Sequence, residues 1–152
     1  MAELVRGASI PLFDRLSSVG SVTDNRHQLL TPEQLEASIG RELLKLLNTR
    51  SRLLPSEFSA STGTTIDYGI PDTSAISARS PVDLELLQST IQQAICHYEP
   101  RLKDVLVKAF PASRPGGGAL LLISGTLMIG LKLRQLNFEL QLDSQQTHVK
   151  TI

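Results

Sequence analysis

The strongest constraint on the fold is a change of period along the chain. Apolar residues recur every three or four positions before Pro100 and every second position after it. The clearest alternation runs through residues 136–142, where the apolar residues are Leu136, Phe138, Leu140 and Leu142. A period of two is typical of a strand with one buried and one solvent-exposed face. Helices first and sequential strands second favour an α+β fold, with N-terminal helices packed on a C-terminal antiparallel β-sheet.

The same alternation predicts the other strands of this sheet. One strand covers residues 105–109, and another follows the glycine-rich turn at 115–118. In that second strand a buried face is expected to comprise Leu127, Ile129, Leu131 and Leu133. Residues 148–152 are expected to close the sheet as a last short strand.

Two helices are predicted from capping signals and apolar stripes. The first begins after Thr31, with proline at the first helical position and Gln34 placed for a capping box. Its stripe recurs at helical spacing and comprises Leu35, Ile39, Leu43, Leu46 and Leu47. The second helix begins after Ser80, again with a proline in the first turn, and is stopped by Pro100.

These elements divide the chain into two parts. Residues 31–152 are predicted to form a single α+β domain, and residues 1–30 an N-terminal docking helix and linker. The docking helix covers residues 9–16, with Leu12, Phe13 and Leu16 on one face. Residues 55–81 have almost no periodicity and are predicted to be a long loop, which is typical of functional or disordered segments.

Charge and hydropathy exclude several classes of function. The 152 residues include 15 basic and 15 acidic ones, so the net charge is +0 and no positive field favours nucleic acid or anionic membrane. The most apolar stretch, residues 119–131, is shorter than the ~20 residues of a spanning helix, so no membrane insertion is expected. One cysteine and no signal-peptide pattern indicate a cytoplasmic protein.

No metal, cofactor or small-molecule site is predicted. The glycines at 116–118 precede a strand and lack the Gly-Lys-Ser/Thr ending of a phosphate loop. Ser124 lacks the leading glycine of a nucleophile elbow. The histidines lie in three different segments, without the spacing of a helical metal site: His27, His97 and His148.

A pair of carboxylates for glycoside hydrolysis is the remaining enzymatic alternative. Glu99, Asp67 and Asp72 are its possible members. Arg101 lies two residues from Glu99 and favours the ionised carboxylate, which is the wrong form for a catalytic acid. The chain is therefore predicted not to be an enzyme, and peptidoglycan hydrolysis through Glu99 is kept as an alternative.

Three clusters contain residue combinations that a helix end, a loop or a turn does not by itself require: Leu46–Arg50, Tyr68–Asp72 and Tyr98–Leu102. In this order and spacing they resemble the TssE family of type VI secretion baseplate proteins and its relative, the baseplate wedge protein of contractile-tailed phages. The resemblance begins with the Pro-Leu-Phe-Asp-Arg-Leu segment and covers roughly residues 10–143. It leaves open whether the chain serves a secretion system or a phage-derived particle.

The resemblance implies a structural subunit of a contractile injection machine. Such a subunit joins the baseplate wedge proteins TssF and TssG and helps start the polymerisation of sheath proteins by strand pairing. The strands between residues 120 and 152 would offer the sheet edge. The implied protein-binding residues are the Glu-Pro-Arg motif and the ends of the other clusters: Glu99, Pro100, Arg101, Asn48, Thr49, Arg50 and Asp72.

The same residues have a structural interpretation that needs no partner. Arg50 and Arg101 can pair with Glu42 or Glu99 inside the fold, and Asp72 after a proline can be a turn residue. A regulatory protein-binding module on the same fold is a further alternative to the baseplate role.

Overall fold

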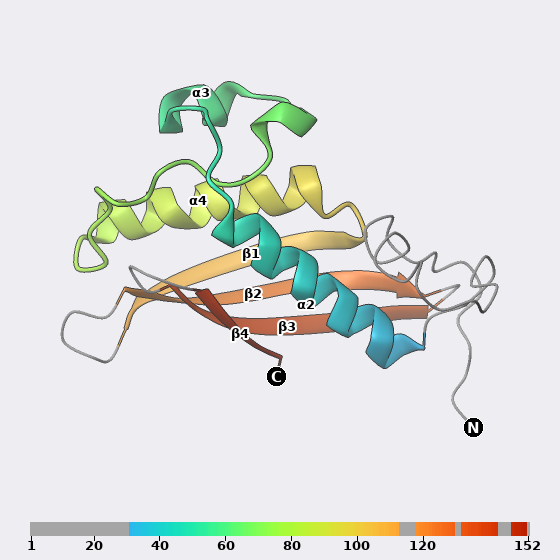
Figure 1. Ribbon diagram of the computed structural model, residues 1–152. Coiled ribbons are helices and arrows are strands. Elements are labelled where there is room, and N and C mark those ends of the chain that lie inside the picture. The colour runs from blue at the N-terminus through green and yellow to red at the C-terminus, as the bar shows by residue number, and fades with distance from the viewer. Residues whose placement is uncertain (1–30, 113–117, 130–131, 143–146, 152) are drawn as a thin grey trace, which may run out of the picture.

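The computed structural model describes residues 31–112, 118–129 and 132–142, and the backbone of 147–151. The predicted docking helix and linker at 1–30 lie outside these residues. Within the described ranges the helices come first and the strands follow, as Figure 1 shows. The α+β fold predicted from the change of period is confirmed.

The sheet has four antiparallel strands in the order β1-β2-β3-β4, so every strand pairs with its neighbour in sequence. Their bounds are β1 (Leu102–Pro111), β2 (Ala119–Ile129), β3 (Lys132–Leu142) and β4 (Thr147–Thr151). The predicted last strand is present as β4. Sequential pairing of this kind needs only short connections.

The long helices α2 (Pro32–Asn48) and α4 (Pro81–Tyr98) lie on the same face of the sheet (Figure 1). At the start of α2 the backbone N–H of Gln34 donates to the Thr31 hydroxyl, and the Gln34 side chain accepts from the Thr31 N–H, which completes the predicted capping box. Ser80 caps α4 as predicted. Among the described residues, no helix is long and apolar enough to cross a membrane.

The core lies between these two helices and the sheet. Its fully buried side chains come from both layers and include Ile39, Leu43, Leu46, Ile91, Ile95, Leu121, Ile123, Phe138 and Leu140. The alternation in β3 is confirmed, because Leu136, Phe138 and Leu140 are buried and Asn137 is exposed. Aliphatic side chains make up nearly all of this core, as the scarcity of aromatic residues implies.

The prediction of one buried face through Leu127, Ile129, Leu131 and Leu133 is wrong. Leu127 is buried, but Leu133 is 74% exposed, and Leu131 lies outside the described residues. The stretch belongs to two strands, since β2 ends at Ile129 and β3 begins opposite it at Lys132. This register pairs odd-numbered residues of β2 with even-numbered residues of β3, so the buried face changes parity between the strands.

The prediction of a structureless loop over residues 55–81 is also wrong in part. The segment contains the helix α3 (Pro55–Ala60) and the 3-10 turn η2 (Thr65–Asp67). In α3 a proline occupies the first turn and the Glu57 carboxylate accepts a backbone N–H at the helix start. Phe58, 2% exposed, anchors this short helix in the core. Because Phe58 is the one buried residue of α3, the segment has no apolar repeat from which a helix could be predicted.

Candidate functional site

The three clusters singled out in the sequence meet in space. We call this region the motif junction: residues 46–50, 68–72 and 98–102. A parallel β-bridge between Arg50 and Ile70 joins the first two clusters. The rings of Tyr68 and Tyr98 join the second and third, edge to face with centroids 5.2 Å apart. The junction therefore connects the end of α2, the loop before α4 and the turn between α4 and β1.

The bridge depends on backbone geometry at Gly69. The N–H of Ile70 donates to the Thr49 carbonyl oxygen at 3.0 Å, and the N–H of Ser51 donates to the Ile70 carbonyl at 2.8 Å. Gly69 has φ +118°, and a Cβ atom there would lie 2.5 Å from the Thr49 carbonyl oxygen. Only glycine fits this position without moving the backbone.

Tyr68 lies at the centre of the junction. Burial raises the pKa of its hydroxyl, and the negative charges of Glu42 and Glu99 raise it further. Tyr98 is half-buried, and its hydroxyl donates to the Thr64 carbonyl oxygen at 3.1 Å. The two rings thus contact each other, and the Tyr98 hydroxyl bonds the loop that precedes the second cluster.

Glu99 and Arg101 form a two-pronged ion pair across Pro100. The Nε atom of Arg101 donates to Oε1 of Glu99 at 2.6 Å, and its Nη2 atom donates to Oε2 at 2.6 Å. Glu99 is only 3% exposed. The Nη1 atom of Arg101 also donates to the hydroxyl of Ser38 on α2 at 3.2 Å. The structural interpretation of Arg101, pairing with Glu99 inside the fold, is confirmed.

This ion pair fixes the turn that leads into the sheet. The N–H of Leu102 donates to the Glu99 carbonyl at 3.1 Å, and β1 begins at that residue. The Leu102 side chain packs over Gly125 of β2, where a Cβ atom would lie 2.5 Å from the Leu102 Cγ atom. A buried charge is stable only when it is paired and hydrogen-bonded, and here both carboxylate oxygens are. Pro100 is presented at the surface of this rigid turn.

The alternative pairing of Arg50 with Glu42 is wrong. Glu42 accepts instead from Lys45, three residues along α2, at 2.8 Å. Arg50 lies eight residues after Glu42 and beyond the end of α2 at Asn48, whereas side chains on a helix contact each other three or four residues apart. Arg50 is exposed.

Asp72 is exposed and behaves as a turn residue, as its structural interpretation expected. Its two carboxylate oxygens accept from the backbone N–H of Ser74 at 3.0 Å and from the Ser74 hydroxyl at 2.9 Å. These bonds to Ser74 hold the pKa of Asp72 below its usual range, and the charge of Arg50 lowers it further. Arg50 and Asp72 therefore lie near each other at the surface of the junction.

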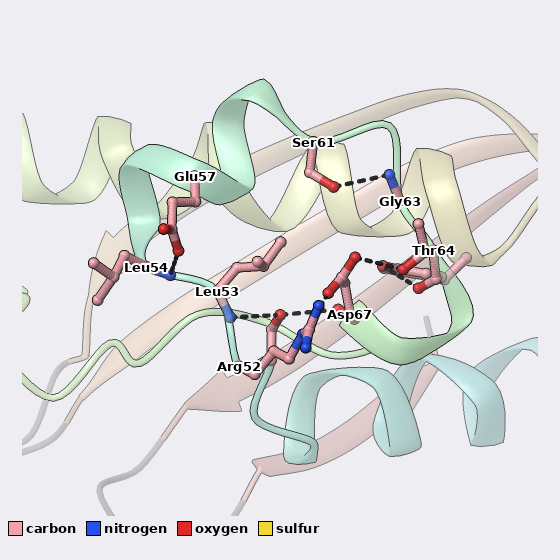
Figure 2. A network of polar contacts seen from close by, with 10 residues as sticks. Arg52, Leu53, Leu54, Glu57, Ser61, Gly63, Thr64 and Asp67 are labelled. Carbon is pink, nitrogen blue, oxygen red and sulfur yellow. Dashed lines mark hydrogen bonds and ion pairs between the residues drawn. The ribbon is translucent and has the colours of Figure 1, made fainter.

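A second polar network, which was not predicted from the sequence, holds the loop that precedes Tyr68 (Figure 2). Asp67 is 6% exposed. Its Oδ1 atom accepts from the Arg52 guanidinium at 3.0 Å and its Oδ2 atom from the Thr64 hydroxyl, and Figure 2 shows these two residues on either side of it. The Ser51 hydroxyl donates to the Asp67 carbonyl oxygen at 2.9 Å. The sequence feature from which this contact could have been predicted is the threonine three residues before the aspartate, because such side chains often bond each other or the backbone within a turn.

These contacts weaken the hydrolase alternative. Both of its buried carboxylates, Glu99 and Asp67, accept hydrogen bonds from an arginine inside the fold, so their oxygens are already occupied by these partners. Asp72 is occupied by its own turn. Within the described ranges, no group of three or more His, Cys, Asp and Glu side chains could hold a metal ion.

The Asp67 network predicts a pH dependence of stability. Thr64, and after it Arg52, hold the pKa of Asp67 below its usual range. A depressed folded-state pKa stabilises the fold above the ordinary value near 4, and this stabilisation is lost as pH falls through the folded-state value. We expect the free energy of unfolding to fall below about pH 4, and to fall less in Asp67→Asn. Denaturant titrations at pH 7 and pH 3 measure the difference.

Thr64→Val is the matched variant for this prediction, because it removes the larger cause of the shift and leaves the charge in place. Its acid sensitivity should lie between that of the wild type and that of Asp67→Asn. An unchanged difference between pH 7 and pH 3 in Asp67→Asn would show that other carboxylates control acid unfolding.

Comparison with known families gives one match. A family model described as baseplate wedge protein gp25 matches residues 33–129, more than half of the chain. Comparison with curated proteins gives no significant match. The matched range includes all three clusters of the motif junction and ends at the last residue of β2.

Proposed function

The chain belongs to the family of the baseplate wedge protein gp25, and we propose that it acts as the TssE-type subunit of a type VI secretion baseplate. In this role it joins the wedge proteins TssF and TssG in the cytoplasm and helps start the polymerisation of sheath proteins. The observation that carries the proposal is the family match over residues 33–129. The meeting of the three resemblance clusters at one junction supports it.

The predicted protein-binding residues divide into two groups. Asn48, Arg50, Asp72 and Pro100 are exposed, whereas Thr49 is half-buried, Glu99 is buried and Arg101 keeps 25% of its side chain exposed. The ion pair of Glu99 and Arg101 is built into the fold, so its role in binding would be to hold the Pro100 turn in place. Arg50 is the better contact residue, because a guanidinium at the surface can form a two-pronged bond with a partner carboxylate.

Strand pairing would use the β4 edge of the sheet rather than the β1 edge. On β1 the N–H of Ala109 already donates to the Gln88 side chain of α4 at 2.8 Å, and Pro111 has no N–H to offer. A bulge between Lys103 and Leu106, with φ +50° at Asp104, interrupts the same strand. These features are typical of a protected edge. The sheet's other edge is the backbone of β4, and we propose that a sheath strand pairs there.

A pull-down from the native cells, with partners identified by mass spectrometry, tests the assembly role. Tagged wild-type protein should recover wedge and sheath subunits, and Arg50→Glu should reduce the recovery of wedge subunits about tenfold, equal to ~1.4 kcal/mol. The matched control is Arg79→Glu, which reverses another exposed arginine outside the junction and should leave recovery unchanged. Both variants should unfold at the wild-type temperature, because both side chains are exposed.

Recovery of only an unrelated soluble regulator would contradict the proposal and favour the regulatory binding module. Equal recovery by wild type and Arg50→Glu, with wedge subunits present, would keep the assembly role and remove Arg50 from the contact.

A further inference from the structure

The sheet face opposite α2 and α4 carries several exposed apolar side chains among its polar ones. Of the nine large hydrophobic residues that are exposed in the part of the chain that the structure describes, five lie on this face: Leu106 (49%), Phe110 (43%), Leu122 (36%), Met128 (68%) and Leu133 (74%). We call it the open face. Each of these residues alternates with residues that face the helices. Polar residues such as Lys108, Asn137 and Glu139 share the face, as is normal for a solvated sheet face, whereas large apolar residues paired directly across two strands indicate a surface that is covered.

The most exposed part of the open face is the pair of Met128 and Leu133, which lie opposite each other across β2 and β3. The pair lies where β2 ends and β3 begins, and Figure 1 shows α2 beginning at that end of the sheet. Arg134, next to Leu133 in β3, reaches the other face and contacts Glu36 of α2 at 3.3 Å and Glu33 at 4.0 Å. Thr31, the first described residue, therefore lies at the same end of the sheet as the Met128–Leu133 pair.

The chain before this point contains a segment of the right chemistry. Residues 10–16 hold four large apolar side chains: Ile10, Leu12, Phe13 and Leu16. Residues 17–30, the tether, separate this segment from α2, and a linker of that many residues can reach roughly 20 Å. A sheet layer is about 10 Å thick, so the tether can pass around its end. A tethered segment also has a millimolar effective concentration, so a small apolar contact suffices.

We propose that residues 10–16 pack against the open face and cover the Met128–Leu133 pair within the same chain. Burial of the apolar side chains on both sides drives the contact. The proposed contact does not depend on the baseplate role.

Methyl NMR of the full chain tests the contact directly. The sequence has two methionines, Met1 and Met128, so protein labelled at the methionine methyl groups gives two signals. The signal of Met128 is assigned by its loss in Met128→Leu. Of the four phenylalanines, Phe58 and Phe138 are buried on the helix side, and Phe110 pairs opposite Leu120 at the far end of the face. Phe13 is then the ring expected beside Met128.

We expect a nuclear Overhauser effect between the Phe13 ring and the Met128 methyl group, and a shift of the Met128 signal in Phe13→Ala. Asp14→Asn, which changes the same segment outside its apolar face, should leave the signal in place. A Met128 signal that is the same in wild type and Phe13→Ala would overturn the proposal. So would a signal that changes on dilution, since a second copy would then be the cover, or one that changes only when wedge proteins are added.

Discussion

Replacement of Arg101 by methionine is expected to lower the free energy of unfolding by roughly 3 kcal/mol. The variant keeps an apolar side chain of similar length but removes every donor that Glu99 uses from this residue's side chain. Glu99 is 3% exposed and both of its oxygens accept from Arg101 at 2.6 Å. The Glu99 carboxylate would then be buried without its partner, which destabilises a fold more than replacing both charged residues does. Urea denaturation at neutral pH measures the loss.

A double-mutant cycle separates the ion pair from the packing of the two side chains. Glu99→Gln removes the charge, and the double variant Glu99→Gln with Arg101→Met should be more stable than the sum of the single losses predicts, by about 2 kcal/mol. Ser38→Ala, which removes the bond to α2 at 3.2 Å, should cost only about 1 kcal/mol. A loss below ~0.5 kcal/mol in Arg101→Met would contradict the structural role of the pair.

This result decides how binding defects at the junction can be interpreted. An Arg101 variant that fails to bind wedge proteins has two explanations, lost contact and a displaced turn, because the same guanidinium also holds Glu99 and Ser38. Arg50 has no such ambiguity, since it is exposed and lies beyond the end of α2. Binding experiments on Arg50 and stability experiments on Arg101 therefore answer separate questions.

The sequence predicted the elements whose causes are local. Thr31 and Ser80 mark helix starts because a cap and the proline after it act within one turn. The alternation in β3 identified a half-buried strand for the same reason. The error at Leu133 arose because the buried residues are odd-numbered in β2 and even-numbered in β3. The sequence has no feature that shows which residue begins β3, so this change could not be predicted.

The candidate site shows the same division. Pairing of Glu99 with Arg101 could be predicted, because the two residues are neighbours on one turn. The bridge of Arg50 with Ile70 and the bond of Arg52 to Asp67 could not, because they join segments whose path has no period. Such contacts depend on where the loop between α2 and α4 crosses the core. Gly69 was the residue that marked the crossing, since its backbone approaches Thr49 too closely for any side chain.

Substitution of Gly69 by alanine is expected to destabilise the fold by roughly 3 kcal/mol. A φ of +118° is essentially closed to residues with a Cβ atom and costs about 1–3 kcal/mol. The new methyl group would also lie 2.5 Å from the Thr49 carbonyl oxygen, which is backbone and cannot rotate away. Relief requires the two strands of the bridge to separate, with loss of the bonds that Ile70 makes to Thr49 and Ser51.

Gly63→Ala is the matched control, because it tests positive φ without a backbone clash. Gly63 has φ +73°, near the left-handed region that alanine enters at a cost of about 1–2 kcal/mol. A Cβ atom there would lie 2.8 Å from Cγ and 2.9 Å from Cβ of His97, so the base of that side chain on α4 must shift, whereas at Gly69 the nearest atoms belong to the backbone of the bridge. Both substitutions should therefore lower the free energy of unfolding in denaturant titrations, and the Ile70 amide distinguishes them. Hydrogen exchange at the Ile70 amide should quicken in Gly69→Ala alone, since that amide forms the bridge. Equal losses of unfolding free energy, with unchanged hydrogen exchange at the Ile70 amide, would contradict this account. The cost of Gly69→Ala would then come from the positive φ alone and not from the bridge between the clusters.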